Sequence, residues 1–255
     1  MLISIYKPIG MTPLEIINTL KSTDKQLSNK KITYAGRLDP LAHGVLLLLI
    51  GDEIEKKADY LQLIKTYEFE IVLGVATDTY DILGYVKELE LKETEKNVKL
   101  FVNKFVNKLI GKYIQEYPPY SSKAVKGKPL FWWAKNNRLH EIEIPKHEIE
   151  IFNFSVLSVG DISIKKLEEK IKNEISLIKG DFRQEIILKR WHEFFSKTDT
   201  SKQLTTIKFS ISCSSGTYIR SIAEQIGREL GCGAVAIDIL RINVGSYSLT
   251  DAIKL

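Results

Sequence analysis

The hydrophobic pattern of the chain changes between a period of two and a helical period. Apolar and polar residues alternate in four segments, a pattern typical of half-buried strands. These segments are residues 2–6, 67–73, 141–159 and 207–213. A continuous apolar run at residues 45–50 predicts one further buried segment, which would anchor the loop before it to the core.

Apolar residues spaced three and four apart predict helices between these strands. The first helix follows Thr12, because Pro13 supplies a proline at the first helical position and Glu15 completes a capping box. Further helices are predicted at residues 54–64, at residues 95–110 and between residues 217 and 231.

Residues 163–199 carry two helical repeats that a glycine separates. Apolar steps of three and four begin at Ile164, stop at Gly180 and restart at Ile187, which predicts a helical hairpin. Its charged residues leave two interpretations open. One is a solvated helix pair packed on the core, and the other is a dedicated module for RNA or a partner; the first is preferred.

Composition and charge fit a globular protein with a mild basic excess. The 255 residues are 44% hydrophobic and 27% charged, and the net charge of +5 is compatible with a nucleic-acid partner without requiring one. The length suits one large domain or one and a half, and a single domain, residues 1–255, is expected. Two cysteines without C-x-x-C spacing and four scattered histidines predict no metal site. Because neither a signal peptide nor a membrane span is predicted, a cytoplasmic protein is expected.

Residues 36–44 place a carboxylate beside a proline in a glycine-flanked loop. Pro40 biases Asp39 toward an extended backbone, and the glycines permit sharp turns, so the carboxylate is expected at the lip of a loop. Catalytic acids are often presented in this way. An ordinary Asp-Pro turn explains the same residues, and both interpretations are open at this point.

Two further residues and one segment are candidates for a functional site. Tyr67 is either a core ring or a platform for a base, and its position alone favours the core. In residues 117–135 lysines are interleaved with aromatics, which suits a nucleic-acid surface or a solvated loop before a packed helix. Arg220 lies in the first turn of a predicted helix, where the helix dipole disfavours a cation. An anionic partner is therefore expected, and Asp39 is a candidate.

Several motifs occur in the order found in one known family. They are Gly36-Arg37-Leu38-Asp39-Pro40-Leu41-Ala42-His43-Gly44, Lys65-x-Tyr67, Thr77-Asp78-Thr79-x-Asp81-x-x-Gly84 and Gly216-Thr217-Tyr218-Ile219-Arg220. With them the chain resembles the TruB family of tRNA pseudouridine synthases over residues 3–74, 109–135 and 207–253. The resemblance implies the pseudouridine synthase fold, an α/β (α+β) domain with a mixed, largely antiparallel central sheet flanked by helices. Residues 163–199 lie outside it and are interpreted as an inserted helical hairpin.

The resemblance also implies roles for individual residues. Asp39 is the expected catalytic residue, Arg220 pairs with it, and Tyr67 stacks on the target base. Tyr218 and Leu240 are expected to support the site, Leu240 as a wall of the uracil pocket. The expected RNA contacts are Lys7, Lys123, Lys126 and Lys128, together with Tyr34 and His43, where this chain departs from the family's bacterial members.

The implied activity is isomerisation of uridine to pseudouridine in tRNA, at uridine 55 of the T-arm loop. It uses base flipping and an aspartate, without a cofactor or metal. The tRNA T-arm is the expected partner, with no membrane and no required protein partner, and the chain is expected to be a monomer without the C-terminal PUA domain of most members. Two alternatives are a non-catalytic tRNA-folding chaperone of the same fold and a guide-dependent relative that modifies ribosomal RNA in a larger complex.

Overall fold

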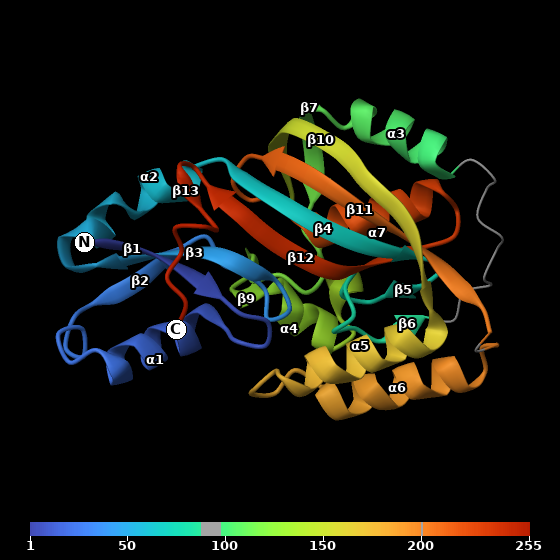
Figure 1. Cartoon of the computed structure of the whole chain (residues 1–255), viewed down its shortest axis with the longest axis horizontal. Coiled ribbons are helices and arrows are strands. Elements are labelled where there is room, and N and C mark those ends of the chain that lie inside the picture. The colour runs from blue at the N-terminus through green and yellow to red at the C-terminus, as the bar shows by residue number, and fades with distance from the viewer. Residues whose placement is uncertain (88–97, 200) are drawn as a thin grey trace.

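The computed structural model describes residues 1–87, 98–199 and 201–255, and its centre is one long, twisted sheet (Figure 1). The strands are β1 (Leu2–Lys7), β2 (Ile32–Ala35), β3 (His43–Ile50), β4 (Lys65–Leu73), β7 (Gly111–Glu116), β10 (Lys146–Ser163), β11 (Gln203–Cys213), β12 (Ala234–Val244) and β13 (Tyr247–Ser248). Their order is β1-β3-β12-β4-β11-β10-β7, with β2 beside β3 and β13 beside β12. Neighbours are antiparallel except β12 and β3, which are parallel. Two short pairs lie apart from this sheet, β5 (Ala76–Thr77) with β6 (Val86–Lys87) and β8 (Ala124–Val125) with β9 (Lys128–Pro129).

Helices cover both faces of the central sheet. They are α1 (Pro13–Thr23), α2 (Lys57–Gln62), α3 (Val98–Lys108), α4 (Leu130–Lys135), α5 (Ile164–Ser176), α6 (Gln184–Ser196) and α7 (Ile219–Glu229). In Figure 1, α5 and α6 lie side by side below the sheet, and α3 lies above it beside β10. None of the helices in the described ranges combines the length and the apolar character needed to cross a bilayer.

The unbroken apolar run at residues 45–50 is explained by the place of β3 in the sheet. Leu46 and Leu48 pack into a cluster on one face, and Val45 and Leu49 pack into a different cluster on the other. Successive residues of a strand point to opposite faces, so a strand covered on both sides needs apolar residues at every position. Strand β3 is therefore packed against an apolar cluster on each face, and it anchors the loop before it.

The hairpin predicted at residues 163–199 is present as α5 and α6. Its apolar residues form one cluster with Val72 and Val235 of the central sheet. The buried indole of Trp191 on α6 donates from Nε1 to the carbonyl oxygen of Ile82, 3.1 Å away. The hairpin is therefore packed on the core, as the preferred interpretation has it.

Expectation and structure differ mainly at the ends of elements. The strand expected at residues 141–159 begins and ends later as β10, because its start pairs with β7 and its end continues along β11. The helix expected at residues 54–64 starts as a 3-10 helix, Gly51–Lys56, and continues as the short α2. The helix expected at residues 95–110 corresponds to α3, and residues 95–97 lie outside the described residues.

Candidate active site

Asp39 lies in the loop between β2 and β3, and glycines shape both ends of that loop. Gly36 and Gly44 have φ angles of +80° and +108°, a region that residues with a side chain rarely adopt. A Cβ on Gly44 would also lie 2.2 Å from the carbonyl oxygen of Arg241. Both glycines are therefore needed for the turn that carries the carboxylate.

Lys7 braces this loop from inside the protein. Its side chain is fully buried, and Nζ donates to the carbonyl oxygens of Pro8 at 2.8 Å, Pro40 at 3.2 Å and Ala42 at 2.6 Å. Burial lowers the pKa of Lys7 to about 7, against the opposing effect of the Asp39 carboxylate. The prediction that Lys7 contacts an RNA phosphate is wrong, because its ammonium group lies away from the surface.

Arg241 is a second buried brace, and sequence analysis assigned it no role. It is 1% exposed. Nε donates to the carbonyl oxygen of Val45 at 2.7 Å and Nη2 to that of Gly36 at 3.0 Å, so one guanidinium group ties both ends of the Asp39 loop together. The signal in the sequence is an arginine within the largely apolar strand β12.

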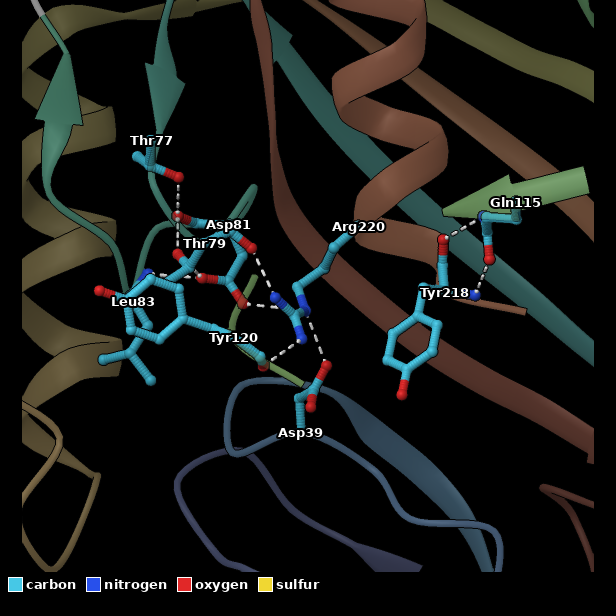
Figure 2. Close-up of polar contacts among 9 residues, drawn as sticks. All are labelled: Asp39, Thr77, Thr79, Asp81, Leu83, Gln115, Tyr120, Tyr218 and Arg220. Atoms are coloured by element: carbon cyan, nitrogen blue, oxygen red, sulfur yellow. Dashed lines mark hydrogen bonds and ion pairs between the residues drawn. The ribbon is translucent and has the colours of Figure 1, made fainter. Parts of the chain in front are cut away.

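Arg220, in the first turn of α7, is paired with Asp39 (Figure 2). Its Nε donates to Asp39 Oδ2 at 2.8 Å and lies 3.4 Å from Asp81 Oδ2. The other nitrogens donate to the carbonyl oxygens of Thr79 and, at 3.5 Å, of Tyr120. Burial opposes the charge on Arg220, but the two carboxylates outweigh it and raise its pKa above the ordinary value. The site therefore contains a permanent cation between two acids.

Asp81 is the inner acid of this group and Asp39 the outer one. The hydroxyl of Thr79 and the N–H of Leu83 both donate to Asp81 Oδ1, at 2.7 and 3.0 Å (Figure 2). The side chain of Asp81 is 10% exposed and that of Asp39 is 36% exposed. Asp81 thus orients Arg220 from within, and Asp39 is placed to reach a ligand.

Asp39 borders a cavity of about 610 Å³, a volume typical of sites that enclose a small organic ligand. Tyr67 on β4 forms part of the wall. It is 8% exposed, and burial raises its pKa. At neutral pH the phenol is therefore protonated, and the ring offers a flat apolar face beside the carboxylate.

Leu240 does not line this cavity, contrary to expectation. Strand β12 places Ile239 and Arg241 in the wall. Since successive residues of a strand point to opposite faces, Leu240 points away. Ile239, which is 8% exposed, takes the wall position, and the prediction is one residue out of register.

Lys65 and Tyr218 add polar groups to the cavity wall. Lys65 is 4% exposed and donates from Nζ to the carbonyl oxygen of Leu61 at 2.5 Å. Burial, with the nearby charge of Arg241, lowers the pKa of Lys65 to about 8. The backbone of Tyr218 exchanges hydrogen bonds of 2.8 and 3.1 Å with the Gln115 amide (Figure 2). Sequence analysis assigned no role to Lys65, although it belongs to a quoted motif.

Lys123, Lys126 and Lys128 are exposed on the segment that leads into α4. The ammonium of Lys123 lies 5.1 Å from the ring centroid of Tyr117, and that of Lys128 lies 4.1 Å from the ring of Trp132. These cation–π contacts keep lysines and aromatic rings together at the surface. RNA contact by the three lysines stays a prediction.

Tyr34 and His43 are both engaged within the protein, and neither borders the cavity. The ring nitrogens of His43 lie 3.0 Å from the Tyr6 hydroxyl and 3.0 Å from Asp238 Oδ1. Tyr34 packs on the cluster that α1 forms with the sheet, and Lys57 lies over its ring. RNA contact by these two residues stays a prediction. His43 links β1 to β12, and Tyr34 packs.

Metal-ligand chemistry has no candidate among the described residues, where no group of three or more His, Cys, Asp or Glu side chains is arranged to hold an ion. Cys213 and Cys232 are buried free thiols. The groups gathered at the cavity instead include the partly exposed carboxylate of Asp39, the buried guanidinium group of Arg220 and the aromatic ring of Tyr67.

The sequence matches the family described as "TruB family pseudouridylate synthase (N terminal domain)" over residues 24–182. The chain belongs to the TruB family. The matched range contains Asp39, Tyr67 and Asp81, three of the residues that the structure brings together around the cavity.

Curated relatives of this TruB chain match it over nearly its whole length. The tRNA pseudouridine synthase B of Clostridium novyi is 32% identical over 256 residues, covering 100% of this chain and 70% of the relative. The enzyme of that name from Thermosipho melanesiensis is 30% identical over 258 residues, covering 99% and 66%. That of Thermotoga petrophila is 29% identical over 250 residues, covering 98% and 64%. The TruB chain thus spans about two thirds of the length of these relatives.

Two solved structures share the fold of the TruB chain. The crystal structure of a Cbf5-Nop10-Gar1 complex contains a chain with a TM-score of 0.58 and 20% identity, covering 100% of this chain and 52% of that one. The H/ACA RNP bound to a substrate RNA containing 2′-deoxyuridine gives a TM-score of 0.56 and 17% identity, covering 99% and 50%. At these identities the likeness concerns the fold alone, and it confirms the expected mixed α/β fold.

Proposed function

We propose that this TruB protein isomerises uridine to pseudouridine in tRNA, with uridine 55 of the T-arm loop as its target. The observation that carries the proposal is the Asp39–Arg220 pair in the wall of a cavity that Tyr67 also lines. The relatives named tRNA pseudouridine synthase B favour the same reaction and the same class of RNA.

The reaction exchanges one bond to the ribose for another. The bond between N1 of uracil and C1′ of the ribose breaks, the base rotates, and C5 forms a new bond to C1′. The proton on C5 leaves, and N1 gains a proton. Atoms and electrons balance within the nucleotide, so the reaction needs no oxidant, reductant or second substrate.

Asp39 is the group that acts on the nucleotide. It either attacks a carbon of the target or removes a ribose proton, and both roles need a free carboxylate oxygen. Oδ2 accepts the N–H of Arg220 at 2.8 Å, which leaves Oδ1 for the nucleotide. This charge-assisted hydrogen bond fixes the direction of the carboxylate, and the fork geometry of arginine suits it better than lysine does.

Tyr67 and Ile239 receive the uracil. Taking a base out of a folded loop costs a few kcal/mol of unstacking. Stacking on an aromatic ring contributes about 1–3 kcal/mol per base, so the ring of Tyr67 offsets much of that cost. Ile239 provides an apolar wall of the same cavity.

The T-arm is bound through the exposed lysines ahead of α4. Lys123, Lys126 and Lys128 are placed to contact phosphates, which position the RNA without reading its sequence. Tyr117 and Trp132, beneath two of these lysines, add aromatic surface. We expect a monomer that acts in the cytoplasm on tRNA without a protein partner.

The test is release of tritium from C5-labelled uridine in an unmodified tRNA transcript. Wild-type protein is compared with Asp39→Asn, and the transcript is compared with one whose T-loop target is changed to cytidine. Release that requires both Asp39 and the target uridine is the expected result. Tight binding of tRNA without release of tritium would overturn the proposed enzymatic activity and favour a tRNA-folding chaperone.

A further inference from the structure

The turn between α5 and α6, residues 177–183, reaches the catalytic cavity. Asp181, Phe182 and Arg183 belong to the cavity wall together with Asp39. The hairpin lies outside the motifs that the sequence shares with the family, and yet it closes one side of the site.

Arg183 connects this turn to two segments beside the active site. Nη1 donates to Asp78 Oδ2 at 3.0 Å and to the Tyr120 hydroxyl at 2.8 Å. The guanidinium carbon lies 4.4 Å from the ring centroid of Tyr120 and 4.2 Å from that of Tyr85. The Arg183 side chain is 14% exposed. A planar guanidinium group can bond an acid and a hydroxyl while stacking on rings, which an ammonium group cannot.

The backbone at Arg183 is fixed in an uncommon conformation. Its φ and ψ of 66° and 23° are in the left-handed region, which residues with a side chain seldom occupy. Gln184 stabilises the turn, because Nε2 donates to the carbonyl oxygens of Ile178 at 3.1 Å and Gly180 at 2.7 Å. Its Oε1 accepts the N–H of Phe182 at 2.9 Å. The place of the guanidinium group is therefore set by an ordered turn.

The segments that Arg183 holds also supply acceptors for Arg220. Asp78 precedes Thr79, whose carbonyl oxygen accepts an N–H of Arg220. The carbonyl oxygen of Tyr120 accepts another, at 3.5 Å (Figure 2). Displacing either segment would move the acceptors that orient the guanidinium group of Arg220.

Leu177 brings the same turn against Gly10, a neighbour of the Asp39 loop. A Cβ on Gly10 would lie 2.6 Å from both the Cβ and the carbonyl oxygen of Leu177, so the two backbones touch there. The N–H of Gly10 donates to the carbonyl oxygen of Pro40 at 2.9 Å, next to Asp39. The turn therefore lines the cavity through residues 181–183 and also touches Gly10, which is hydrogen-bonded to the Asp39 loop.

We propose that Arg183 is a positioning residue for the isomerisation, acting through Tyr120 and Asp78 on Arg220. The inference rests on the proposed function, because it concerns the same site. The family match ends at residue 182, so Arg183 lies outside the range that the match covers.

The test measures the single-turnover rate of pseudouridine formation at saturating tRNA, with the Kd for the same tRNA in parallel. Arg183→Ala is expected to lower the rate about 10- to 100-fold, the usual effect of losing a residue that supports a catalytic group. Its Kd should stay within about threefold of wild type. Tyr120→Phe removes only the hydroxyl, so its loss should be smaller, and the double variant should be no slower than Arg183→Ala.

Two further variants separate positioning from folding. Arg183→Lys keeps the charge and the stem but not the fork, and should lose rate in the same way. Lys189→Ala changes an exposed residue of α6, the helix that follows Arg183, and should keep the wild-type rate. A rate for Arg183→Ala within about twofold of wild type would overturn the inference. A loss of tRNA affinity without a loss of rate would also overturn it. The same holds if the rate losses of Arg183→Ala and Tyr120→Phe multiply in the double variant. Wild-type protein that forms no pseudouridine would instead overturn the proposed function itself.

Discussion

Arg220 Nε and Asp39 Oδ2 are joined by a hydrogen bond of 2.8 Å although the two residues are 181 positions apart in the chain. Asp39 precedes β3, and Arg220 lies in α7, which leads into β12. Because β12 lies beside β3 in the sheet, the sheet order brings the two side chains together. The acid and its partner therefore exist as a pair only in the folded protein, and changes to one should affect stability as well as activity.

Replacing Arg220 with alanine should destabilise the protein strongly. The change leaves the buried carboxylate of Asp81 without its cation, and removing one partner of a buried pair typically costs about 3–5 kcal/mol. The free energy of unfolding in urea measures the effect. Arg228→Ala, an exposed arginine of the same helix, is the matched control and should change it by less than about 0.5 kcal/mol.

The double variant Arg220→Ala, Asp81→Asn identifies the source of that loss. It should be more stable than Arg220→Ala alone, since the uncompensated charge is gone. If the double variant is as unstable as the single one, the loss comes from packing and not from a buried charge.

Tyr67→Leu should weaken binding of the T-arm RNA, because it removes the ring on which the base stacks. Base–aromatic stacking is worth about 1–3 kcal/mol, so the Kd for a T-arm RNA should rise about 5- to 150-fold. Tyr67→Phe keeps the ring, and its Kd should stay within about threefold of wild type. Equal losses in the two variants would assign the effect to the hydroxyl. Filter binding with one T-arm stem-loop measures both.

Lys65 should make the stability of the protein depend on pH above neutrality. Its pKa in the folded protein is about 8 and its ordinary value is 10.5, so between these values the unfolded chain binds more protons. The free energy of unfolding therefore rises with pH in this window. Relative to Lys65→Met, wild-type protein should gain about 2 kcal/mol between pH 7.5 and pH 10.

The matched control for this measurement is Lys25→Met, which changes an exposed lysine. The difference in the free energy of unfolding between Lys25→Met and wild type should be the same at both pH values, because the other titrating groups are common to the two proteins. If the free energy of unfolding of Lys65→Met also differs from that of wild type by the same amount at both pH values, burial does not lower the pKa of the Lys65 amine.

The sequence predicts β1, β3, β4, β10, β11 and the hairpin because their signal is local. The alternation in β4 and the steps of three and four in α5 are set by which face of each element is buried. The ends of elements depend on partners elsewhere. The strand β10 extends to Ser163 because β11 continues beside it, and no local pattern encodes that pairing.

The residues of the site also divide into those that the sequence predicts and those that it does not. Motifs identify Asp39, Tyr67 and Arg220 because they are short and contiguous in sequence. Lys7 is misassigned because a lysine fully buried on carbonyl oxygens looks, in sequence, like any surface lysine. Arg183 is missed because its role arises from tertiary contacts with Asp78 and Tyr120 that the sequence does not place side by side.

Lys128 provides the sharpest test of the RNA surface. If its ammonium contacts a phosphate, Lys128→Ala should weaken tRNA binding and reduce the slope of log Kd against log salt by about 1. The effect should be uniform across RNA sequences, because phosphates carry no sequence information. Lys99→Ala, at an exposed position of α3, should leave both affinity and slope as they are. An unchanged slope for Lys128→Ala with weakened affinity would mean that the lysine acts by holding Trp132, 4.1 Å away, and would place the phosphates elsewhere.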